Sequence, residues 1–453
     1  MTARQKRIVL VLSVLIALTR LAAVAQSFLD WDEALFISGV RAFDVAVHHP
    51  HPPGYPLFVG AANVLHACGM DEFRALQAIA LAGACLLFPA LFALALELGF
   101  DFATAAAGAA LFAFLPNVWL YGGTAFSDVP AAALTFAACA LLLRGRRDAR
   151  AFFLGALVLG VAAGMRTPSL LVGAVPALLA TWHRVRAREY VLVLCATFAG
   201  AAVVAASYGG AALASSSVAD YVDAVRAQSR YVRDVDSWRN PQRGPIGGAF
   251  FTFVLQPFQH RDVLNGIAIA AGVSLLAALW RRRAAPLLTF AMFAPLALVA
   301  SLNFDINAAS RYAIGFMGAH ALLAADGFRV IFRRTAAQAA FSAITIAVLC
   351  VVTAPALREQ RTTVAPAVAA LRYAERHVDP KQPLYVHGSM RPHADVLLHG
   401  REVRFFVDYE RVERGAWVID ERVHPAAVTF VRPRRATWKV LRRRNYEAAV
   451  LRK

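Results

Sequence analysis

The first three quarters of the chain alternate between long apolar segments and shorter polar connections. A helix needs about 20 predominantly apolar residues to cross a bilayer, and most of these segments approach that length. The pattern therefore predicts eleven membrane-spanning helices. Their approximate bounds are 8–26, 75–98, 103–121, 128–143, 151–165, 168–182, 190–212, 264–280, 285–302, 312–330 and 337–356.

The fifth and sixth segments are short, and one long helix broken at Arg166-Thr167-Pro168 is the alternative. The basic connections decide between the two, because positively charged loops stay on the cytoplasmic side. Two separate helices place the arginine-rich connections at 144–150, 184–188, 281–283 and 333–334 on one side. This arrangement predicts a cytoplasmic N-terminus and an external C-terminus. Because no convincing small-residue cleavage site precedes the acidic loop, we expect the first helix to be retained and not cleaved as a signal peptide.

Composition agrees with a polytopic membrane protein. Hydrophobic residues make up 59% of the chain and charged residues 17%, with a mean hydropathy of +0.52, against about half and a quarter in soluble domains. The net charge of +18 lies largely in the short arginine-rich loops, so it argues against nucleic-acid binding. Five cysteines, mostly inside apolar segments, give neither a disulfide framework nor a CxxC metal pattern.

The character of the chain changes near residue 357. We expect residues 1–356 to form the membrane domain and 357–453 a small α/β domain outside the membrane. Three short strands are predicted near 383–390, 403–409 and 416–420, and a helix over 437–453. His387 and His393 are expected to be ordinary surface residues. The long connection 213–263 is predicted to hold interfacial helices. The fold class is thus an α-helical polytopic membrane protein with a small α/β C-terminal domain.

An acidic cluster follows the first apolar segment. Asp32 and Glu33 stand where a membrane helix meets water, and partial loss of hydration there raises the basicity of a carboxylate, as a general base for a hydroxyl requires. Asp30 is two residues away and is expected to cap a helix or bind an ion. The alternative is a solvated acidic loop without function.

Further polar side chains are predicted on the same outer face. Asp128 opens the fourth helix in Ser-Asp-Val-Pro, where the alternative is ordinary helix capping. Arg166 and Arg311, the latter followed by Tyr312, are suited to gripping phosphate through two parallel hydrogen bonds. Their alternative is to reach toward lipid headgroups. Arg20, inside the first segment, is expected to have a buried partner or to reach for the interface.

Three histidines stand among prolines in the acidic loop, at positions 48, 49 and 51. Together with the nearby acids they are candidates for a divalent metal site. The His-His-Pro-His order lacks the i, i+4 spacing of helical metal sites, and the prolines predict an extended turn. A divalent metal therefore remains possible as a cofactor, with its ligands undetermined.

These motifs together resemble a known family. DWDEALF after the first segment, HPPGYPLF in the same loop, SDVP, RTPSLL and SRYAIGFMGAHALLAADG are similar to the GT-C glycosyltransferases. The nearest branch is glycosyltransferase family 39, which includes protein O-mannosyltransferases and aminoarabinose transferases acting on lipid A. The resemblance covers the chain to about residue 330 and is weak in the tail.

The resemblance implies a sugar donor linked to polyprenyl phosphate, and metal dependence in some members. It implies an envelope glycan, lipid or protein acceptor outside the membrane. By this match Asp32 corresponds to the catalytic acidic residue of the family, and Arg311 to a basic position that we expect to bind the donor phosphate. From their predicted place on the same outer face, we further expect Glu33 and Asp128 to orient the acceptor or a metal, and Arg166 to hold the phosphate together with Arg311. His51 and Tyr312 are also expected to take part in binding the donor phosphate. Some relatives have a lysine where this chain has His51, so how His51 would contribute stays open.

Two rival interpretations belong to other classes. A transporter or flippase would place ionisable groups near mid-membrane and broken helices in repeated halves, whereas these acids stand at outer helix ends. An inactive protein with the same fold is the second rival, and only an assay separates it. The sequence predicts no nucleic-acid partner and a location in the inner (plasma) membrane. It does not identify the sugar, the acceptor or the carrier lipid.

Overall fold

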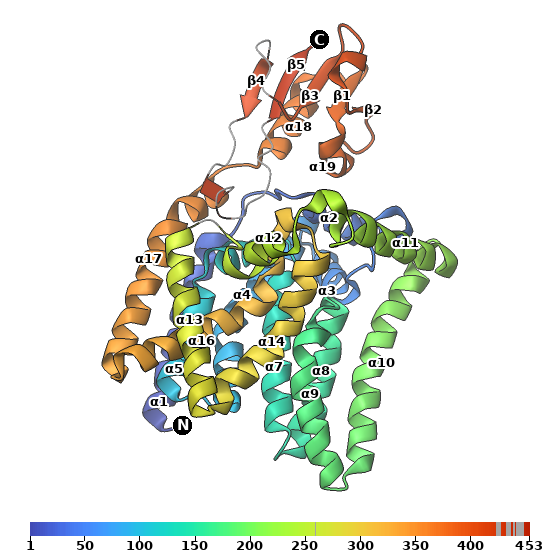
Figure 1. Ribbon diagram of the computed structural model, residues 1–453. Coiled ribbons are helices and arrows are strands. Elements are labelled where there is room, and N and C mark those ends of the chain that lie inside the picture. The colour runs from blue at the N-terminus through green and yellow to red at the C-terminus, as the bar shows by residue number, and fades with distance from the viewer. Residues whose placement is uncertain (259, 423–426, 432–435, 438–439, 441–447) are drawn as a thin grey trace.

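The protein is a bundle of long helices with a small α/β domain at one end (Figure 1). The computed structural model describes residues 1–258, 260–422, 427–431, 436–437, 440 and 448–453. Each of the eleven predicted segments coincides with helix. The long helices are α1 (Ala3–Arg20), α4 (Glu72–Leu98), α5 (Phe102–Ala113), α7 (Asp128–Arg144), α8 (Ala149–Met165), α9 (Ser169–Arg186), α10 (Tyr190–Ala214), α13 (Arg261–Arg281), α14 (Ala284–Asn303), α16 (Ile314–Phe332) and α17 (Thr335–Thr362).

The chain is a multi-pass membrane protein. By length and composition, six helices among the described residues can cross a membrane, namely α4, α10, α13, α14, α16 and α17 with its continuation. The other long helices are shorter or carry more charge, yet they pack beside these six; α4 lies against α7, and α7 against α8.

The prediction that the fifth and sixth segments are two separate helices is confirmed. Helix α8 ends at Met165 and α9 begins at Ser169, with Arg166 as the extended residue that ends α8. The third segment, predicted as one helix over 103–121, is instead two helices, α5 and α6 (Pro116–Tyr121). Proline has no N–H to continue the ladder and favours the first turn of a new helix, so the chain turns at Pro116.

The two ends of the bundle differ. The N-terminus lies at one end, together with the turn between α9 and α10 (Figure 1). At the opposite end lie α2 (Trp31–Arg41), α3 (Pro56–Ala67), α11 (Val218–Tyr231) and α12 (Ile246–Phe250), below the C-terminal domain. The helices predicted within 213–263 are thus confirmed. The proposed domain division at residue 356 falls inside α17, which continues to Thr362.

Arg20 has the buried partner that the sequence predicted. Its side chain is fully buried, and its Nη1 donates to the carbonyl oxygen of Ala113 over 2.7 Å. The guanidinium also lies over the ring of Trp119, 4.9 Å from the centroid. The carbonyl belongs to the last turn of α5, where backbone oxygens lack helical partners. Arg20 therefore fastens α1 to the end of α5.

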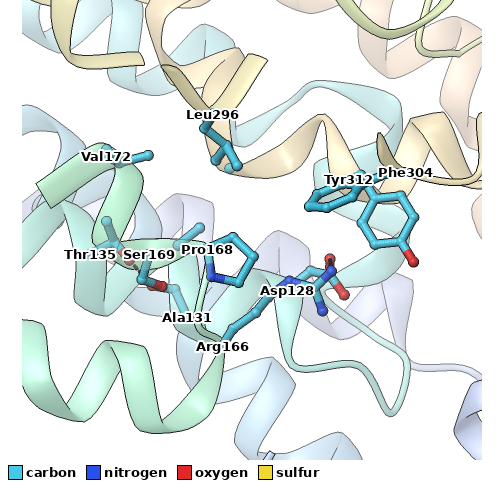
Figure 2. Close-up of a pocket in the computed structure, with 12 residues that line it drawn as sticks. Asp128, Ala131, Thr135, Arg166, Pro168, Ser169, Val172, Leu296, Phe304 and Tyr312 are labelled. Atoms are coloured by element: carbon cyan, nitrogen blue, oxygen red, sulfur yellow. Dashed lines mark hydrogen bonds and ion pairs between the residues drawn. The ribbon is translucent and has the colours of Figure 1, made fainter. Parts of the chain in front are cut away.

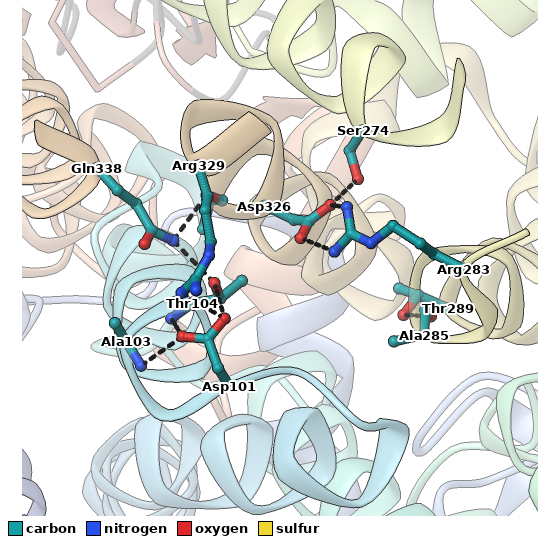
Figure 3. A network of polar contacts seen from close by, with 11 residues as sticks. Asp101, Ala103, Thr104, Ser274, Arg283, Ala285, Thr289, Asp326, Arg329 and Gln338 are labelled. Carbon is teal, nitrogen blue, oxygen red and sulfur yellow. Dashed lines mark hydrogen bonds and ion pairs between the residues drawn. The ribbon is translucent and has the colours of Figure 1, made fainter. Parts of the chain in front are cut away.

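A second polar network joins the helices away from the C-terminal domain (Figure 3). Asp326 of α16 is buried and accepts hydrogen bonds from Ser274 at 2.6 Å and from Arg283 at 2.5 and 2.9 Å. Nearby, Arg329 pairs with Asp101 at 2.7 Å. Each buried charge in this network has an opposite charge beside it, which is the condition for tolerating it in an apolar surrounding. The network thus holds α5, α13 and α16 in register.

The C-terminal domain contains one five-stranded sheet in the order β2-β1-β3-β5-β4. Strands β2, β1 and β3 are parallel, and β5 runs antiparallel to both β3 and β4. The helices α18 and α19 accompany the sheet, α18 packing against β4 and β5. The bounds are α18 (Pro366–His377), β1 (Leu384–His387), α19 (Arg391–Leu397), β2 (Val403–Phe406), β3 (Trp417–Asp420), β4 (Ala427–Val431) and β5 (Ala448–Arg452).

All three predicted strands are present, whereas the terminal helix predicted over 437–453 is only partly correct: the described residues Thr437 and Val440 are helical, but its last part is a strand. Residues 448–452 form β5, and most of 437–447 lies outside the described residues. The run Ala-Ala-Val-Leu is buried completely between β3 and β4. The contacts of this run with β3 on one side and β4 on the other outweigh the helix propensity of alanine and leucine. Propensity is a weak preference that tertiary packing overrides.

The C-terminal domain contacts the bundle through α19 and α2. His393 is fully buried there, not a surface residue as predicted; its ring stacks on Phe28 with centroids 5.3 Å apart, and Nε2 lies 3.2 Å from the carbonyl oxygen of Leu29. Arg41 of α2 donates to the carbonyl oxygen of Val396 over 2.8 Å. The α19–α2 contact therefore ties the domain to the segment that carries the acidic cluster.

Candidate active site

Helix α2 begins at the acidic cluster, and its start is fixed by two carboxylates. Asp30 is the N-cap, and its side chain accepts from the backbone N–H of Asp32, while Glu33 accepts from the N–H of Asp30 over 2.9 Å. This reciprocal arrangement is a capping box, so the predicted capping role of Asp30 is what the structure has. The cap sets the direction in which Asp32 leaves the helix.

Glu33 connects α2 to the loop before α7. It is buried, and it also accepts from the N–H groups of Leu29 at 2.7 Å and Ala125 at 2.9 Å. Burial raises the pKa of Glu33 to about 7, although the three N–H groups act in the opposite direction. Because backbone N–H groups occupy both of its oxygens, Glu33 ties the start of α2 to the loop that carries Ala125.

Asp32 faces an arginine. Its Oδ2 lies 2.5 Å from Nη1 of Arg311, on the short helix α15 (Ala309–Tyr312), and Asp32 keeps 19% of its side chain exposed. The guanidinium of Arg311 is itself buried between aromatic rings, 4.7 Å from the ring centroid of Phe126 and 4.8 Å from that of Tyr312. Its Nη2 also donates to the Tyr312 hydroxyl over 2.9 Å. These contacts hold the guanidinium of Arg311 in one position beside Asp32.

A second carboxylate and arginine lie next to the first pair. Asp128, at the start of α7, accepts from Nη2 of Arg166 over 3.0 Å, and its other oxygen is 3.9 Å from Nε of Arg311. Ser127, not Asp128, occupies the N-cap position of α7, and Asp128 is the first residue of the helix. The predicted alternative of simple capping is therefore wrong for Asp128. Its side chain lies instead beside both arginines, Arg166 and Arg311.

The proline-rich segment supplies a histidine and a tyrosine. Nε2 of His51 lies 2.9 Å from the Tyr55 hydroxyl, and Nδ1 of His51 lies 4.0 Å from Asp32. Burial lowers the pKa of His51 despite the nearby Asp32. A Cβ at Gly39 would come within 2.7 Å of Pro50, so glycine lets α2 approach this segment closely enough for His51 to reach Asp32.

Three buried polar atoms in this cluster lack a hydrogen-bond partner among the described residues. They are Nε of Arg311, Oδ2 of Asp128 and Nδ1 of His51. Nearly all buried polar atoms in proteins are paired, because an unpaired one costs about 1–3 kcal/mol. Three such atoms in one cluster of charged side chains are typical of a preorganised polar site, so we take this cluster as the candidate active site.

A narrow cavity of about 30 Å³ borders this cluster and is lined in part by Asp128, Arg166 and Tyr312 (Figure 2). Asp128 and Arg166 point toward each other at its edge, and Tyr312 and Phe304 stand across from them. The remaining wall comes from α7, α9, α14 and α16. Its other lining residues are Ala131, Ala132, Thr135, Pro168, Ser169, Val172, Leu296 and Gly315.

The structure brings all the predicted site residues into one cluster. These are Asp32, Glu33, His51, Asp128, Arg166, Arg311 and Tyr312. Sequence reasoning missed Tyr55, Ser127 and Phe126. Tyr55 stands in the same HPPGYP motif as His51, so that motif was the available signal. Phe126 carries no sequence pattern that distinguishes it from other buried aromatic residues.

The described residues do not form a set of ligands for a divalent metal. No group of three or more histidine, cysteine, aspartate or glutamate side chains with suitable spacing occurs among them. The carboxylates of Asp32 and Asp128 face guanidinium groups, and those of Glu33 face backbone N–H groups. His48, His49 and His51 likewise do not converge with three acids. No step is therefore assigned to a metal.

Solved structures with the same arrangement of helices are known. ArnT from Cupriavidus metallidurans aligns over 99% of this chain and 98% of its own, with a TM-score of 0.55 and 14% identity. The oligosaccharyltransferase of Archaeoglobus fulgidus aligns over 88% of this chain and 63% of its own, with a TM-score of 0.57 and 13% identity. Both are GT-C glycosyltransferases. The chain has the GT-C fold.

A third GT-C structure, the arabinosyltransferase EmbB from Mycobacterium smegmatis, aligns over 73% of this chain and 32% of its own, with a TM-score of 0.50 and 14% identity. The chain spans less than two thirds of the archaeal enzyme but nearly all of ArnT. No protein-family model and no curated protein sequence matches the chain. The likeness therefore lies in the fold, which includes the small C-terminal domain.

Proposed function

We propose that this GT-C protein is a membrane glycosyltransferase that moves a sugar from a polyprenyl-phosphate donor to an acceptor hydroxyl outside the cytoplasm. The observation that carries the proposal is the pair of buried arginines, Arg166 and Arg311, set beside the carboxylate Asp32. Arginine binds phosphate through parallel N–H bonds, and a carboxylate accepts the proton of an attacking hydroxyl. The two requirements of the reaction thus meet in one cluster.

In the proposed reaction the acceptor oxygen attacks the anomeric carbon of the sugar. A new glycosidic bond forms as the bond from that carbon to the phosphate oxygen breaks, and polyprenyl phosphate leaves with the bonding electrons. Asp32 takes the proton of the acceptor hydroxyl. Arg311 and Arg166 stabilise the negative charge that grows on the leaving phosphate, which is the kind of preorganised electrostatic stabilisation that enzymes use most.

Binding of the donor changes the partners of the arginines. Without it, Arg311 is held by Asp32 and Arg166 by Asp128. A phosphate with several negatively charged oxygens competes for the same N–H groups. Its arrival would release Asp32 from Arg311 and leave the carboxylate available as a base. Asp128 lies close to both arginines and would keep them aligned during this exchange.

The lipid part of the donor needs an apolar surface near the arginines. A cavity of about 660 Å³ lies between α13, α14 and α16 and is lined almost entirely by apolar side chains. One of its walls includes Phe316, one helical turn beyond Tyr312, and another includes Pro295 and Ala297, which flank Leu296 of the narrow cavity. Structures of ArnT with undecaprenyl phosphate and of the archaeal enzyme with dolichol phosphate support a carrier of this kind.

The transporter alternative receives less support. The ionisable groups of a transporter would line a path through the membrane centre. The charged side chains of the candidate site instead gather beside α2 and α15, below the C-terminal domain. Envelope glycans, lipids and proteins all remain candidate acceptors, and the inner (plasma) membrane is the proposed location.

The proposal is tested with the purified protein in lipid nanodiscs. A set of synthetic polyprenyl-phosphate sugars is supplied together with an extract of envelope glycans, lipids and proteins. We expect labelled sugar to appear on an acceptor, with an equal amount of polyprenyl phosphate released. Sugar donors that are bound but never consumed, with lipid moved between the leaflets of vesicles instead, would favour the transporter alternative.

A further inference from the structure

His51 has one ring nitrogen in use and one that is not. Its Nε2 lies 2.9 Å from the Tyr55 hydroxyl. Its Nδ1 is buried and has no hydrogen-bond partner within the described part of the chain. Nearly all buried polar atoms in proteins are paired, and an exception among charged side chains calls for an explanation. Nδ1 of His51 is therefore a candidate for a contact that forms only in another state of the site.

The neighbours of the ring determine which nitrogen carries the hydrogen. Burial lowers the pKa of His51, and a neutral imidazole has one N–H donor and one acceptor nitrogen. Nδ1 faces Oδ1 of Asp32 at 4.0 Å, where a lone pair would be repelled by the carboxylate. We therefore assign the hydrogen to Nδ1, which leaves Nε2 to accept from the Tyr55 hydroxyl. His51 thus directs an N–H toward Asp32.

Packing fixes the direction of this N–H. The ring of His51 lies against those of Phe36 and Tyr55, with centroids 5.7 and 4.9 Å away. Tyr55 has a left-handed backbone, with φ 48° and ψ 51°, immediately before α3. A residue other than glycine is strained in that region and stays there only where its surroundings hold it, as they do at functional sites. The His51 ring therefore has little freedom to turn away from Asp32.

The two oxygens of Asp32 face different neighbours. Oδ2 lies 2.5 Å from Nη1 of Arg311, whereas Oδ1 is the oxygen 4.0 Å from Nδ1 of His51. An N–H to oxygen hydrogen bond spans about 2.7–3.2 Å, so a movement of about 1 Å would bring Oδ1 within reach of His51. While Arg311 binds Oδ2, the carboxylate stays on the side of Arg311.

We propose that His51 is a positioning residue, which receives Asp32 when the phosphate of a lipid-linked donor binds Arg311. This inference rests on the proposed function, because phosphate binding at Arg311 is part of it. In the exchange, the hydrogen bond from Arg311 to Oδ2 breaks and one from Nδ1 of His51 to Oδ1 forms, with no transfer of a proton. A partly buried carboxylate that loses its partner is costly, and His51 offers a donor that is already oriented.

The exchange would also select the oxygen of Asp32 that acts as the base. His51 holds Oδ1, so Oδ2, which Arg311 releases, is the oxygen left to take the proton of the acceptor hydroxyl. A base oriented by a third group is a recurring arrangement in enzymes that activate a hydroxyl. In this scheme His51 acts through Asp32, in contrast to the direct contact with phosphate expected from the sequence.

Two substitutions separate the two nitrogens of the ring. Glutamine places its amide near the position of Nε2, so His51→Gln keeps a polar group beside Tyr55 and removes the donor toward Asp32. Asparagine places its amide nitrogen near the position of Nδ1, so His51→Asn restores that donor. The matched control is His66→Gln, the same change at an exposed histidine in the last turn of α3.

The test is a binding titration of the full-length protein in nanodiscs of zwitterionic lipid. The probe is polyprenyl phosphate that carries no sugar, so turnover is not required. We expect His51→Gln to raise the dissociation constant about tenfold, because the bound state loses one hydrogen bond to a charged group. His51→Asn and His66→Gln should bind like the wild type. Thermal unfolding without the probe should be the same for His51→Gln and the wild type, since Nδ1 has no described partner in that state.

A second background tests whether His51 acts through Asp32. In Asp32→Asn the side chain at position 32 carries no charge for His51 to receive. Adding His51→Gln to this variant should therefore change the dissociation constant by no more than about twofold. A phosphate contact made by His51 itself would give the same tenfold loss in both backgrounds.

Three results would overturn the inference while leaving the proposed function in place. They are equal affinity of His51→Gln and the wild type, a loss in His51→Asn as large as that in His51→Gln, and the same loss with or without Asp32. Failure of the wild type to bind polyprenyl phosphate would overturn both. A protein that shows the expected dependence on Asp32 but transfers no sugar would support the inference and contradict only the proposed function.

Discussion

Asp32 and Asp30 are two residues apart, yet the structure gives them different tasks. Asp32 faces Arg311, whereas Asp30 caps α2. Asp32→Asn keeps the shape of the side chain and removes its basicity. We expect turnover in the sugar-transfer assay to fall by about 10²–10⁴-fold, the usual contribution of a general base, while binding of polyprenyl phosphate persists.

The matched control for this change is Asp30→Asn. Asparagine is as good an N-cap as aspartate, so we expect turnover close to that of the wild type. Equal losses in both variants would show that the two carboxylates act as a unit, and full activity in Asp32→Asn would remove that residue from the mechanism.

Arg311 is the residue that links the base to the phosphate. Arg311→Lys replaces a planar group with five donors by a single ammonium, which cannot reach both Asp32 and Tyr312 as Arg311 does. We expect the dissociation constant for polyprenyl phosphate to rise by about tenfold, the equivalent of one lost hydrogen bond to a charged group. The measurement is a lipid-binding titration in detergent.

Arg329→Lys provides the comparison, because Arg329 pairs with Asp101 in the network of Figure 3, at another place in the bundle. It should bind polyprenyl phosphate like the wild type. The assignment of Arg311 fails if its lysine variant keeps donor affinity and loses only acceptor affinity.

Glu33 makes the stability of the α2 region depend on pH. Its pKa is raised from 4.5 to about 7 by burial, so the folded state holds a proton that the unfolded state has released. The stabilisation from this group is complete below pH 4.5 and is lost as the pH rises to about 7. The change amounts to roughly 3 kcal/mol at most.

Thermal unfolding of the wild type and of Glu33→Gln, measured at several pH values, checks this expectation. The difference in stability between the two proteins should shrink as the pH rises from 4.5 to 7, because glutamine does not titrate. A difference independent of pH would mean that Glu33 keeps one charge state throughout.

Among the elements, the α19–α2 contact is the one with a titrating group at its centre. Burial lowers the pKa of His393 to about 4 from its usual 6.5, so the docked state holds the neutral ring. The contribution of His393 to the stability of the α19–α2 contact therefore decreases as the pH falls from 6.5, and it is lost near pH 4. The protection factors of the α19 amides, which correct the exchange rate for its intrinsic dependence on pH, should fall over that interval in the wild type and not in His393→Phe.

The helices were easier to predict than the last strand, for a physical reason. Membrane helices satisfy their own backbone groups and show their apolar length directly in the sequence. Strand β5 depends on partners from β3 and β4, and a short Ala-Ala-Val-Leu run fits helix or strand equally well until those partners are known. The buried position of His393 had no sequence signal either, since it depends on where α19 meets Phe28.

At the scale of the whole molecule, the N-terminus and the C-terminal domain stand at opposite ends of the bundle (Figure 1). The basic connections predict which end is cytoplasmic. Alkaline phosphatase fused after residue 186, at the end of α9, should be inactive, and the same enzyme fused after residue 382, beyond α18, should be active. An inactive fusion at 382 would place the C-terminal domain in the cytoplasm and overturn the proposed topology.

The site could be predicted as a set of residues but not as a geometry. Acids and arginines at helix ends on one predicted face identified Asp32, Asp128, Arg166 and Arg311. Their pairing could not be derived, because it depends on the packing of segments up to 279 residues apart. The contact of Glu33 with the N–H of Ala125 could not be derived for the same reason, because the two residues are 92 positions apart.

Arg20 has a consequence for the order in which the protein is made. Its buried hydrogen bond goes to Ala113, 93 residues further along the chain. A ribosome releases α1 into the membrane well before α5 has been synthesised, and an arginine near hydrocarbon is costly until it finds a partner. Helix α1 therefore reaches its final position only after the end of α5 has entered the membrane. In nascent chains that stop before residue 113, α1 should be less stably inserted than in chains that include that residue.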